Sequence, residues 1–325
     1  MPVLALSLDT ADLSRLRWAL SPAWELLASL RALAPPGAST VHMPWLSAHR
    51  DDPLLDQPLV RELATATAGR IPGFLAPTPA SPLTELDEEL AHVRATPVEV
   101  LREDLAAVFG DPLPTTLHPL LRAPRRELDT LTDHLHRYWQ RTLAPHWPRI
   151  RALLESDIHH RARALTERGP AAMLADIHPD LTYDRTTAIL RTTLRHGVPD
   201  RAHRRLEGRG LVLVPSAFAW PGLYVKTVEP WTPVIRYPVR GVGTLWEAAD
   251  TPTDLAAALG TTRARLLDLL ETPATTLELA HRTGLAPGGV SAHLHRLTRA
   301  GLIAPHRTGR TVLYARTTRG EALCN

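Results

Sequence analysis

The sequence predicts an α+β fold in two parts. A mostly helical N-terminal region with a small sheet covers residues 1–245, and a smaller C-terminal domain covers residues 246–325. Three observations lead to this prediction. Helical spacing dominates the chain up to Gly169, short segments rich in Val and Leu follow, and an ordered series of helix and hairpin signals begins at Thr261. A chain of 325 residues is long enough for two domains.

Start signals and spacing place the helices of the N-terminal region. A serine followed by a proline predicts a helix over 22–33, and the segment "SPLTELDEELAHVRA" predicts another. Thr96 and Glu99 have the spacing of a capping box that would begin a further helix. The pattern is then helical over 124–169, with a break near Pro145 and the proline that follows it.

A change in residue composition after the helical stretch predicts the strands. The segment "VLALSL" near the N-terminus has the composition of a strand. Over about 180–240 the chain contains short segments rich in Val and Leu, bounded by Gly and Pro: "AILRTTL", "GLVLVPSAFAW", "GLYVKTV" and "PVIRYPV". We expect these four segments to form one small sheet.

Aromatic residues are concentrated in the same part of the chain. The four that could line a ligand pocket are Trp220, Tyr224, Trp231 and Tyr237. Two interpretations stay open, because aromatic side chains line apolar ligand pockets and also fill the cores of small sheets. In the first interpretation the N-terminal region would sense a small-molecule effector.

Charge is distributed unevenly along the chain. Residues 261–325 contain nine arginines and four acidic residues, a net charge of +5. Residues 1–260 contain 28 basic and 30 acidic residues, a net charge of −2. A basic end on a slightly acidic body is typical of a module that binds a polyanion, although a solvated arginine-rich face would give the same numbers.

Composition also indicates the compartment. Cys324 is the single cysteine, so no disulfide can form within the chain, as is usual in a reducing environment. The first residues lack the basic stretch of a signal peptide, and no apolar run approaches the ~18 residues of a membrane span. We therefore expect a cytoplasmic protein without a membrane partner.

The last 65 residues of the 325-residue chain give the clearest pattern. The segment "TTRARLLDLLE" predicts a helix with one buried stripe of leucines. Thr275 and Glu278 have capping-box spacing, and Gly284 is placed to end that second helix. A third helix is predicted over 287–300, opened by a proline. Two helices joined by so short a turn predict a helix-turn-helix.

The third helix is predicted to have an apolar face and a basic face. Val290, Leu294 and Leu297 recur at the spacing that places them on one side. The segments "LIAPHR" and "TVLYAR" follow as two strands of a hairpin over 302–316, with Gly309 in the tight turn. A helix-turn-helix followed by such a hairpin is a winged helix. Its predicted DNA-binding residues are Gly288, Ser291, Ala292, His295, Arg296, Arg299, Arg307 and Arg310.

The segments "ELA", "VSAHLHRLTRAGL" and "GRTVLYART" occur in an order and spacing that resemble the winged-helix domain of ArsR-type bacterial repressors. The long region before them resembles an N-terminal extension of such regulators from high-GC bacteria. The resemblance implies a repressor that binds double-stranded DNA at an inverted-repeat operator as a homodimer. It also implies an effector that changes DNA affinity.

Metal sensing does not follow from the resemblance. The metal sensors of the family use a Cys pair before the turn, where this chain has "LELAHRTG", or His and carboxylates at the C-terminus, where it has "TTRGEALCN". Histidines two apart on a helix, as in "HLH", point in different directions and cannot hold one ion. We therefore expect no metal and no cofactor.

Other functional classes have weaker support. The sequence contains no nucleophile elbow, phosphate-binding loop or dinucleotide fingerprint, so no enzyme is predicted. The alternative to a DNA-binding regulator is a winged helix that binds a protein partner and has no operator. Arginines on the recognition helix and at the wing tip, Arg299 and Arg310, favour DNA.

Overall fold

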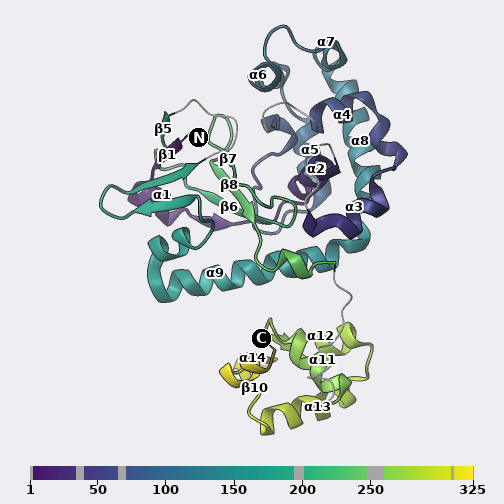
Figure 1. Ribbon diagram of the computed structural model, residues 1–325, viewed down its shortest axis with the longest axis vertical. Coiled ribbons are helices and arrows are strands. Elements are labelled where there is room, and N and C mark those ends of the chain that lie inside the picture. Colours follow the sequence, from purple (N-terminus) through teal and green to yellow (C-terminus); the bar gives the residue numbers. More distant parts are fainter. Residues whose placement is uncertain are drawn as a thin grey trace. The chain divides into compact units, whose positions relative to one another are not determined.

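The computed structural model describes residues 3–33, 40–64, 71–193, 201–246, 259–308 and 311–324. The chain divides into two compact units, Met1–Trp246 and Glu247–Asn325, which are described separately (Figure 1). Helix predominates and the sheets are small, so the protein is α+β as the sequence predicts. No helix in the described ranges is long and apolar enough to cross a membrane.

Helices form the larger part of the N-terminal unit. They are α1 (Thr10–Ser14), α2 (Pro22–Leu33), α3 (Met43–His49), α4 (Pro58–Ala64), α5 (Leu86–Arg94), α6 (Val98–Phe109), α7 (His118–Arg122), α8 (Pro124–Thr142) and α9 (Trp147–Ala175). The helix predicted over 22–33 is confirmed, and the predicted break near Pro145 separates α8 from α9. Backbone dihedrals inside α9 leave the helical region at Gly169, where the sequence predicts the end of the helical stretch.

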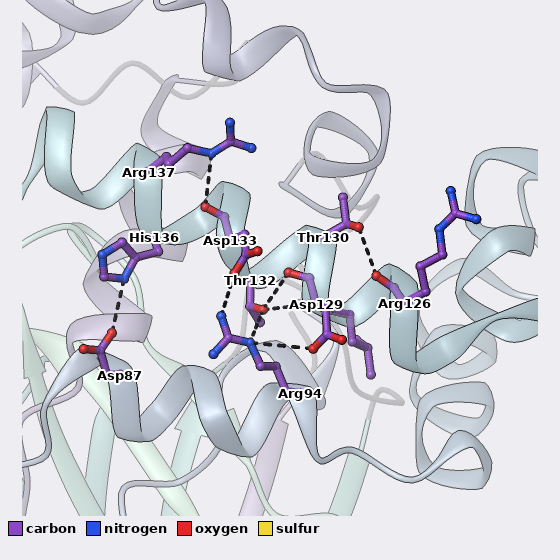
Figure 2. Close-up of polar contacts among 10 residues, drawn as sticks. Asp87, Arg94, Arg126, Asp129, Thr130, Thr132, Asp133, His136 and Arg137 are labelled. Atoms are coloured by element: carbon purple, nitrogen blue, oxygen red, sulfur yellow. Dashed lines mark hydrogen bonds and ion pairs between the residues drawn. The ribbon is translucent and has the colours of Figure 1, made fainter.

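Packing of α5 against α8 illustrates how the helical part is held together. Leucines at positions 128, 131 and 135 of α8 are buried, as helical spacing requires. Polar contacts close the edge of this interface (Figure 2). Arg94 on α5 donates from Nε to Thr132 Oγ1 over 2.7 Å and from Nη2 to Asp133 over 2.7 Å, and His136 Nδ1 lies 3.2 Å from Asp87.

Two four-stranded sheets replace the one small sheet that the sequence predicts. The first has the order β3 (Leu181–Asp184), β4 (Ile189–Thr193), β1 (Val3–Ser7), β5 (Arg201–Arg205). The second has the order β2 (Arg17–Trp18), β6 (Val212–Ser216), β8 (Val234–Pro238), β7 (Tyr224–Lys226). In the second sheet β2, β6 and β8 are parallel, and β7 is antiparallel to β8. The prediction was wrong here because strands from the first 20 residues pair with strands nearly 200 residues later, which local patterns do not reveal.

The capping box predicted at Thr96 and Glu99 is also wrong. Helix α6 begins at Val98 with Pro97 as its N-cap, and no side chain caps it. Thr96 instead donates a hydrogen bond to the carbonyl of His92 at the end of α5. Pro97 has an extended backbone with φ −61° and ψ 147°, so the helix starts one residue later than an N-cap at Thr96 requires.

Helix α9 connects the helical part to the sheets (Figure 1). Arg161 and Asp157 on α9 form a buried ion pair with Nε and Oδ2 2.9 Å apart, and both side chains are 1% exposed. The hydroxyl of Tyr237 on β8 donates to Asp157 over 2.9 Å. Removing either partner of the ion pair would leave the other charged and buried, which typically costs about 3–5 kcal/mol of folding stability. The ion pair and its contact with Tyr237 therefore hold α9 against β8.

The C-terminal unit has the winged helix order of elements. It contains α11 (Thr261–Leu269), β9 (Ala274–Thr275), α12 (Thr276–Thr283), α13 (Pro287–Arg299), β10 (Ile303–Thr308), β11 (Thr311–Arg316) and α14 (Thr318–Cys324). Its sheet has the order β10-β11-β9. The core is formed by apolar residues of α11, α12, α13 and the start of the hairpin, including Leu266, Leu279, Val290, Leu294 and Ile303.

Candidate nucleic-acid interface

The turn between α12 and α13 is fixed by local chemistry at both ends of α12. Thr275 and Glu278 form the predicted capping box, with each side chain accepting a hydrogen bond from the other residue's backbone N–H. Those hydrogen bonds from Thr275 hold the pKa of Glu278 below its usual value. Gly284 ends the helix with φ 72°, a conformation that glycine adopts without strain. Helix α13 then begins at Pro287, as predicted.

Helix α13 has one buried face and one exposed face. Val290, Leu294 and Leu297 are at most 2% exposed and pack into the core of the unit. The residues predicted to meet DNA from this helix all lie on the exposed side: Gly288, Ser291, Ala292, His295, Arg296 and Arg299. The period of 3.6 residues per turn accounts for this separation.

The hairpin pairs β10 and β11 in register from Ile303 opposite Arg316 to Thr308 opposite Thr311. Arg307, the predicted wing residue on β10, is exposed. The turn residue Gly309 and the predicted wing-tip residue Arg310 lie outside the described residues. Thr308, which follows the predicted strand segment "LIAPHR", is the last residue of β10.

Two groups of arginines in this unit differ in what they contact. Arg316 donates to the carbonyls of Leu267 and Asp268 over 2.6 Å each, and Arg282 donates to the carbonyl of Leu269 over 3.3 Å. These two arginines satisfy the C-terminal end of α11, where a positive charge is favourable. They therefore have a structural use that the sequence did not reveal.

The second group consists of Arg296, Arg299 and Arg307. Within the described part of the chain, none of their side chains makes a hydrogen bond, and no carboxylate oxygen lies within 4.0 Å of them. They are exposed and belong to α13 and β10. Unpaired guanidinium groups of this kind suit phosphate contacts, because each can donate two parallel hydrogen bonds.

The four aromatic residues predicted as a ligand pocket are not brought together. Tyr237 is fully buried between the sheets and α9. Tyr224 and Trp231 pack instead against the helical core, with the Tyr224 ring 4.9 Å from that of Trp24. Trp220 is 48% exposed. Tyr224 is paired with Arg236, the neighbour of Tyr237 on β8, so the two tyrosines face opposite sides of the sheet.

A pocket of about 470 Å³ lies elsewhere in the N-terminal unit, lined in part by Arg15, Arg17 and Arg209. These three arginines are not among the predicted site residues. Arg15 and Arg17 are near the N-terminus and Arg209 lies almost 200 positions later, so their proximity depends on the pairing of β2 with β6. The only local signal is the segment "EGRG", whose two glycines flank Arg209.

Over the ranges given above, no group of three or more His, Cys, Asp or Glu side chains is arranged to hold a metal ion.

Comparison with known proteins agrees with the geometry of the C-terminal unit. Residues 261–306 match a model described as "Helix-turn-helix domain". This match, on α11 to β10, supports a DNA-binding regulator with a winged helix. Residues 104–243 match a "Family of unknown function (DUF5937)". No curated protein matches the chain.

One solved structure shares sequence with part of the chain, the reduced HlyU from Vibrio cholerae N16961. It is 28% identical over 23% of this chain and 80% of its own length. Its TM-score is 0.20, which is too low to establish a shared fold.

Proposed function

We propose that the chain is an ArsR-type transcriptional repressor. In this proposal α13 is the recognition helix and the β10–β11 hairpin is the wing. The observation that supports it most strongly is the exposed face of α13, where Arg296 and Arg299 have no partner among the described residues. Both arginines lie within the segment that matches a helix-turn-helix domain. A helix that exposes unpaired arginines beside small side chains suits the major groove of DNA.

Most of the binding free energy is assigned to phosphates rather than to bases. The first half of α13 has Gly288, Ser291 and Ala292 on its exposed side, and these residues offer few groups to read base edges. The arginines lie in the last turn. Arg299 then contacts a phosphate or the edge of the groove, and Arg310 enters the minor groove. Sequence preference comes partly from the shape of the DNA.

The active species is proposed to be a homodimer on an inverted repeat. One recognition helix reads too few base pairs for useful affinity, whereas two related half-sites about one helical turn apart double the contact. The N-terminal unit is assigned to effector sensing or dimerisation, because a winged helix alone binds DNA without it. The proposal assigns binding and no catalysis.

The experiment measures the affinity of the full chain for a duplex that the wild-type chain itself selects from a random-sequence library. Fluorescence anisotropy over a series of salt concentrations gives the affinity and its salt dependence. Arg296→Ala and Arg299→Ala are each expected to weaken binding and to lower the slope of log K against log [salt] by about one per lost phosphate contact.

Arg319→Ala is the matched control, because Arg319 is also exposed but belongs to α14 rather than to α13 or the hairpin strands. Its affinity and salt slope should equal those of the wild type. If the library yields no preferred duplex, or if all three variants lose the same affinity, α13 is not the DNA-binding surface. A protein-binding winged helix would then be the better assignment.

A further inference from the structure

We propose that the arginine-lined pocket of the N-terminal unit binds a small molecule bearing a phosphate or several carboxylates. The pocket has a volume of about 470 Å³, within the range of sites for small metabolites. Arg15, Arg17 and Arg209 line it together with the apolar side chains of Leu16, Leu211 and Val212.

The pocket lies at the amino ends of the parallel strands. Arg17 is the first residue of β2 and is paired with Val212, the first residue of β6. Thr232, also in the lining, comes two residues before β8. Arg209 belongs to the loop that leads from β5 into β6. Backbone pairing of the sheet therefore determines where the three arginines meet.

The loop that carries Arg209 is held closely against the segment that carries Arg15. Gly210 has φ 77°, and a Cβ atom at this position would lie 2.7 Å from the Cβ of Arg15, so only glycine fits. The N–H of Gly210 donates to the fully buried carboxylate of Asp12 over 3.0 Å. Arg15 Nη1 donates to the carbonyl of Gly208. The two sides of the pocket are thus fixed relative to each other.

The guanidinium groups are oriented but not satisfied. Arg17 donates from Nη2 to the carbonyl of Pro79 over 2.5 Å, and Arg209 donates from Nε to the carbonyl of Leu206 over 3.1 Å. Nη1 of Arg17 and Nη1 of Arg209 are both buried and have no hydrogen-bond acceptor. A buried donor without an acceptor costs about 1–3 kcal/mol, and more on a charged group. An oxyanion in the pocket would supply the missing acceptors after a small rotation of either group.

The lining of the pocket contains positive charge without a compensating negative charge. None of its lining residues is acidic. Across the described ranges no carboxylate oxygen lies within 4.0 Å of the side-chain nitrogens of Arg15 or Arg17, and Arg209 Nη1 is 3.9 Å from Glu229, whose side chain is 82% exposed. Burial also lowers the pKa of Arg17. Three guanidinium groups that share a pocket with no carboxylate in its lining would be stabilised by an anionic ligand.

These features define the chemical class of the ligand. A phosphate or a pair of carboxylates accepts parallel hydrogen bonds from guanidinium groups. Leu16, the partly exposed apolar residue of the lining, offers a contact to a less polar remainder of the ligand. That this ligand acts as an effector rests on the proposed function. That the pocket binds the ligand does not depend on the proposed function, so a titration without DNA tests ligand binding alone.

The experiment is isothermal titration calorimetry of the full chain with pyrophosphate and, separately, with citrate, at constant ionic strength. Saturable binding of one probe per chain is expected, and the tighter probe distinguishes phosphate from carboxylate recognition. Arg17→Gln and Arg209→Gln should each weaken binding by about tenfold or more, because each removes a charged donor from the anion. Arg125→Gln, which removes an exposed arginine of α8 outside the pocket, should leave the affinity unchanged.

Circular dichroism of each variant shows whether it folds. Should Arg17→Gln or Arg209→Gln fail to fold, Arg15→Gln is measured in its place. Arg15 is exposed and lines the pocket, so its loss should weaken binding by removing a charged donor. The proposal is overturned if neither probe saturates, or if Arg125→Gln weakens binding as much as the folded pocket variants. Neither result bears on DNA binding by α13.

Discussion

His42 shows how hydrogen bonds fix the protonation state of a single side chain. The ring is buried and stacks on Phe218 with the centroids 4.3 Å apart. Its Nε2 lies 3.1 Å from the carbonyl of Ala217, and its Nδ1 accepts from Nε1 of Trp246 over 2.9 Å. The indole N–H can only donate and the carbonyl can only accept, so the imidazole is neutral with its proton on Nε2. Burial lowers the pKa of His42 to about 4.

This geometry predicts an acid-sensitive contribution to stability. The ordinary pKa of 6.5 applies to the unfolded chain, so the unfolded state takes up the proton first as the pH falls. The stabilisation is complete above pH 6.5 and is lost as the pH drops toward 4. The shift corresponds to about 3 kcal/mol. In His42→Gln, which keeps a donor and an acceptor but cannot titrate, the free energy of unfolding should fall less between pH 7 and pH 5 than in the wild type.

Chemical denaturation at the two pH values gives this difference. His159→Gln serves as the control, since His159 is exposed on α9, and it should follow the wild type. Equal pH dependence of the His42→Gln variant and the wild type would show that the imidazole of His42 is not held neutral in the folded protein.

At the scale of an element, α13 contains a glycine, Gly288, that neither backbone conformation nor packing in the free protein requires. Nothing lies within 4 Å of a Cβ atom placed on Gly288, and its backbone is helical. Glycine within a helix costs up to about 1 kcal/mol relative to alanine. A residue that costs stability without filling a structural need suggests close approach of another molecule to the helix backbone.

Gly288→Ala is therefore expected to raise the thermal unfolding midpoint of the C-terminal unit and to weaken binding to the selected duplex several-fold. The methyl group improves helix propensity, but it would stand between the first turn of α13 and the DNA. Calorimetric unfolding and anisotropy measure the two effects. A variant that is more stable and binds DNA as tightly as the wild type would place the first turn of α13 away from the DNA backbone.

Elements set by local chemistry could be predicted from the sequence, and those set by distant pairing could not. The Thr275 capping box and the buried face of α13 depend on residues within one or two turns of each other, and both are confirmed. The Thr96 capping box is wrong because Pro97 competes for the same position. Division of the strands into two sheets depends on β1 and β2, which no local pattern could assign to their partners.

The candidate sites follow the same rule. The exposed face of α13 comes from one helix and could be predicted residue by residue. The aromatic cluster at 220–237 is close in sequence, yet strand alternation sends Tyr224 and Tyr237 to opposite sides of the sheet. The arginine pocket joins residues from opposite ends of the unit, so only the structure shows it.

At the scale of the whole molecule, the two units have different compositions, and our proposal gives them different tasks. The C-terminal unit contains the helix-turn-helix match, the excess of arginine and a core of its own. The N-terminal unit has a separate core, an anionic-ligand pocket in our proposal, and a match to a family of unknown function. Sensing in the first unit and DNA binding in the second is the division of labour that this organisation supports.

The central claim is that the exposed arginines of α13 bind DNA, and mapping of the chromosomal sites occupied by the full chain in its own cells tests it most directly. Wild type, Arg296→Ala/Arg299→Ala and the Arg319→Ala control are compared at equal abundance. We predict discrete sites in the wild type and the control that contain inverted repeats with half-site centres about 10–10.5 base pairs apart, and their loss in the double variant. Occupancy of the same sites by the double variant at wild-type levels would contradict the claim.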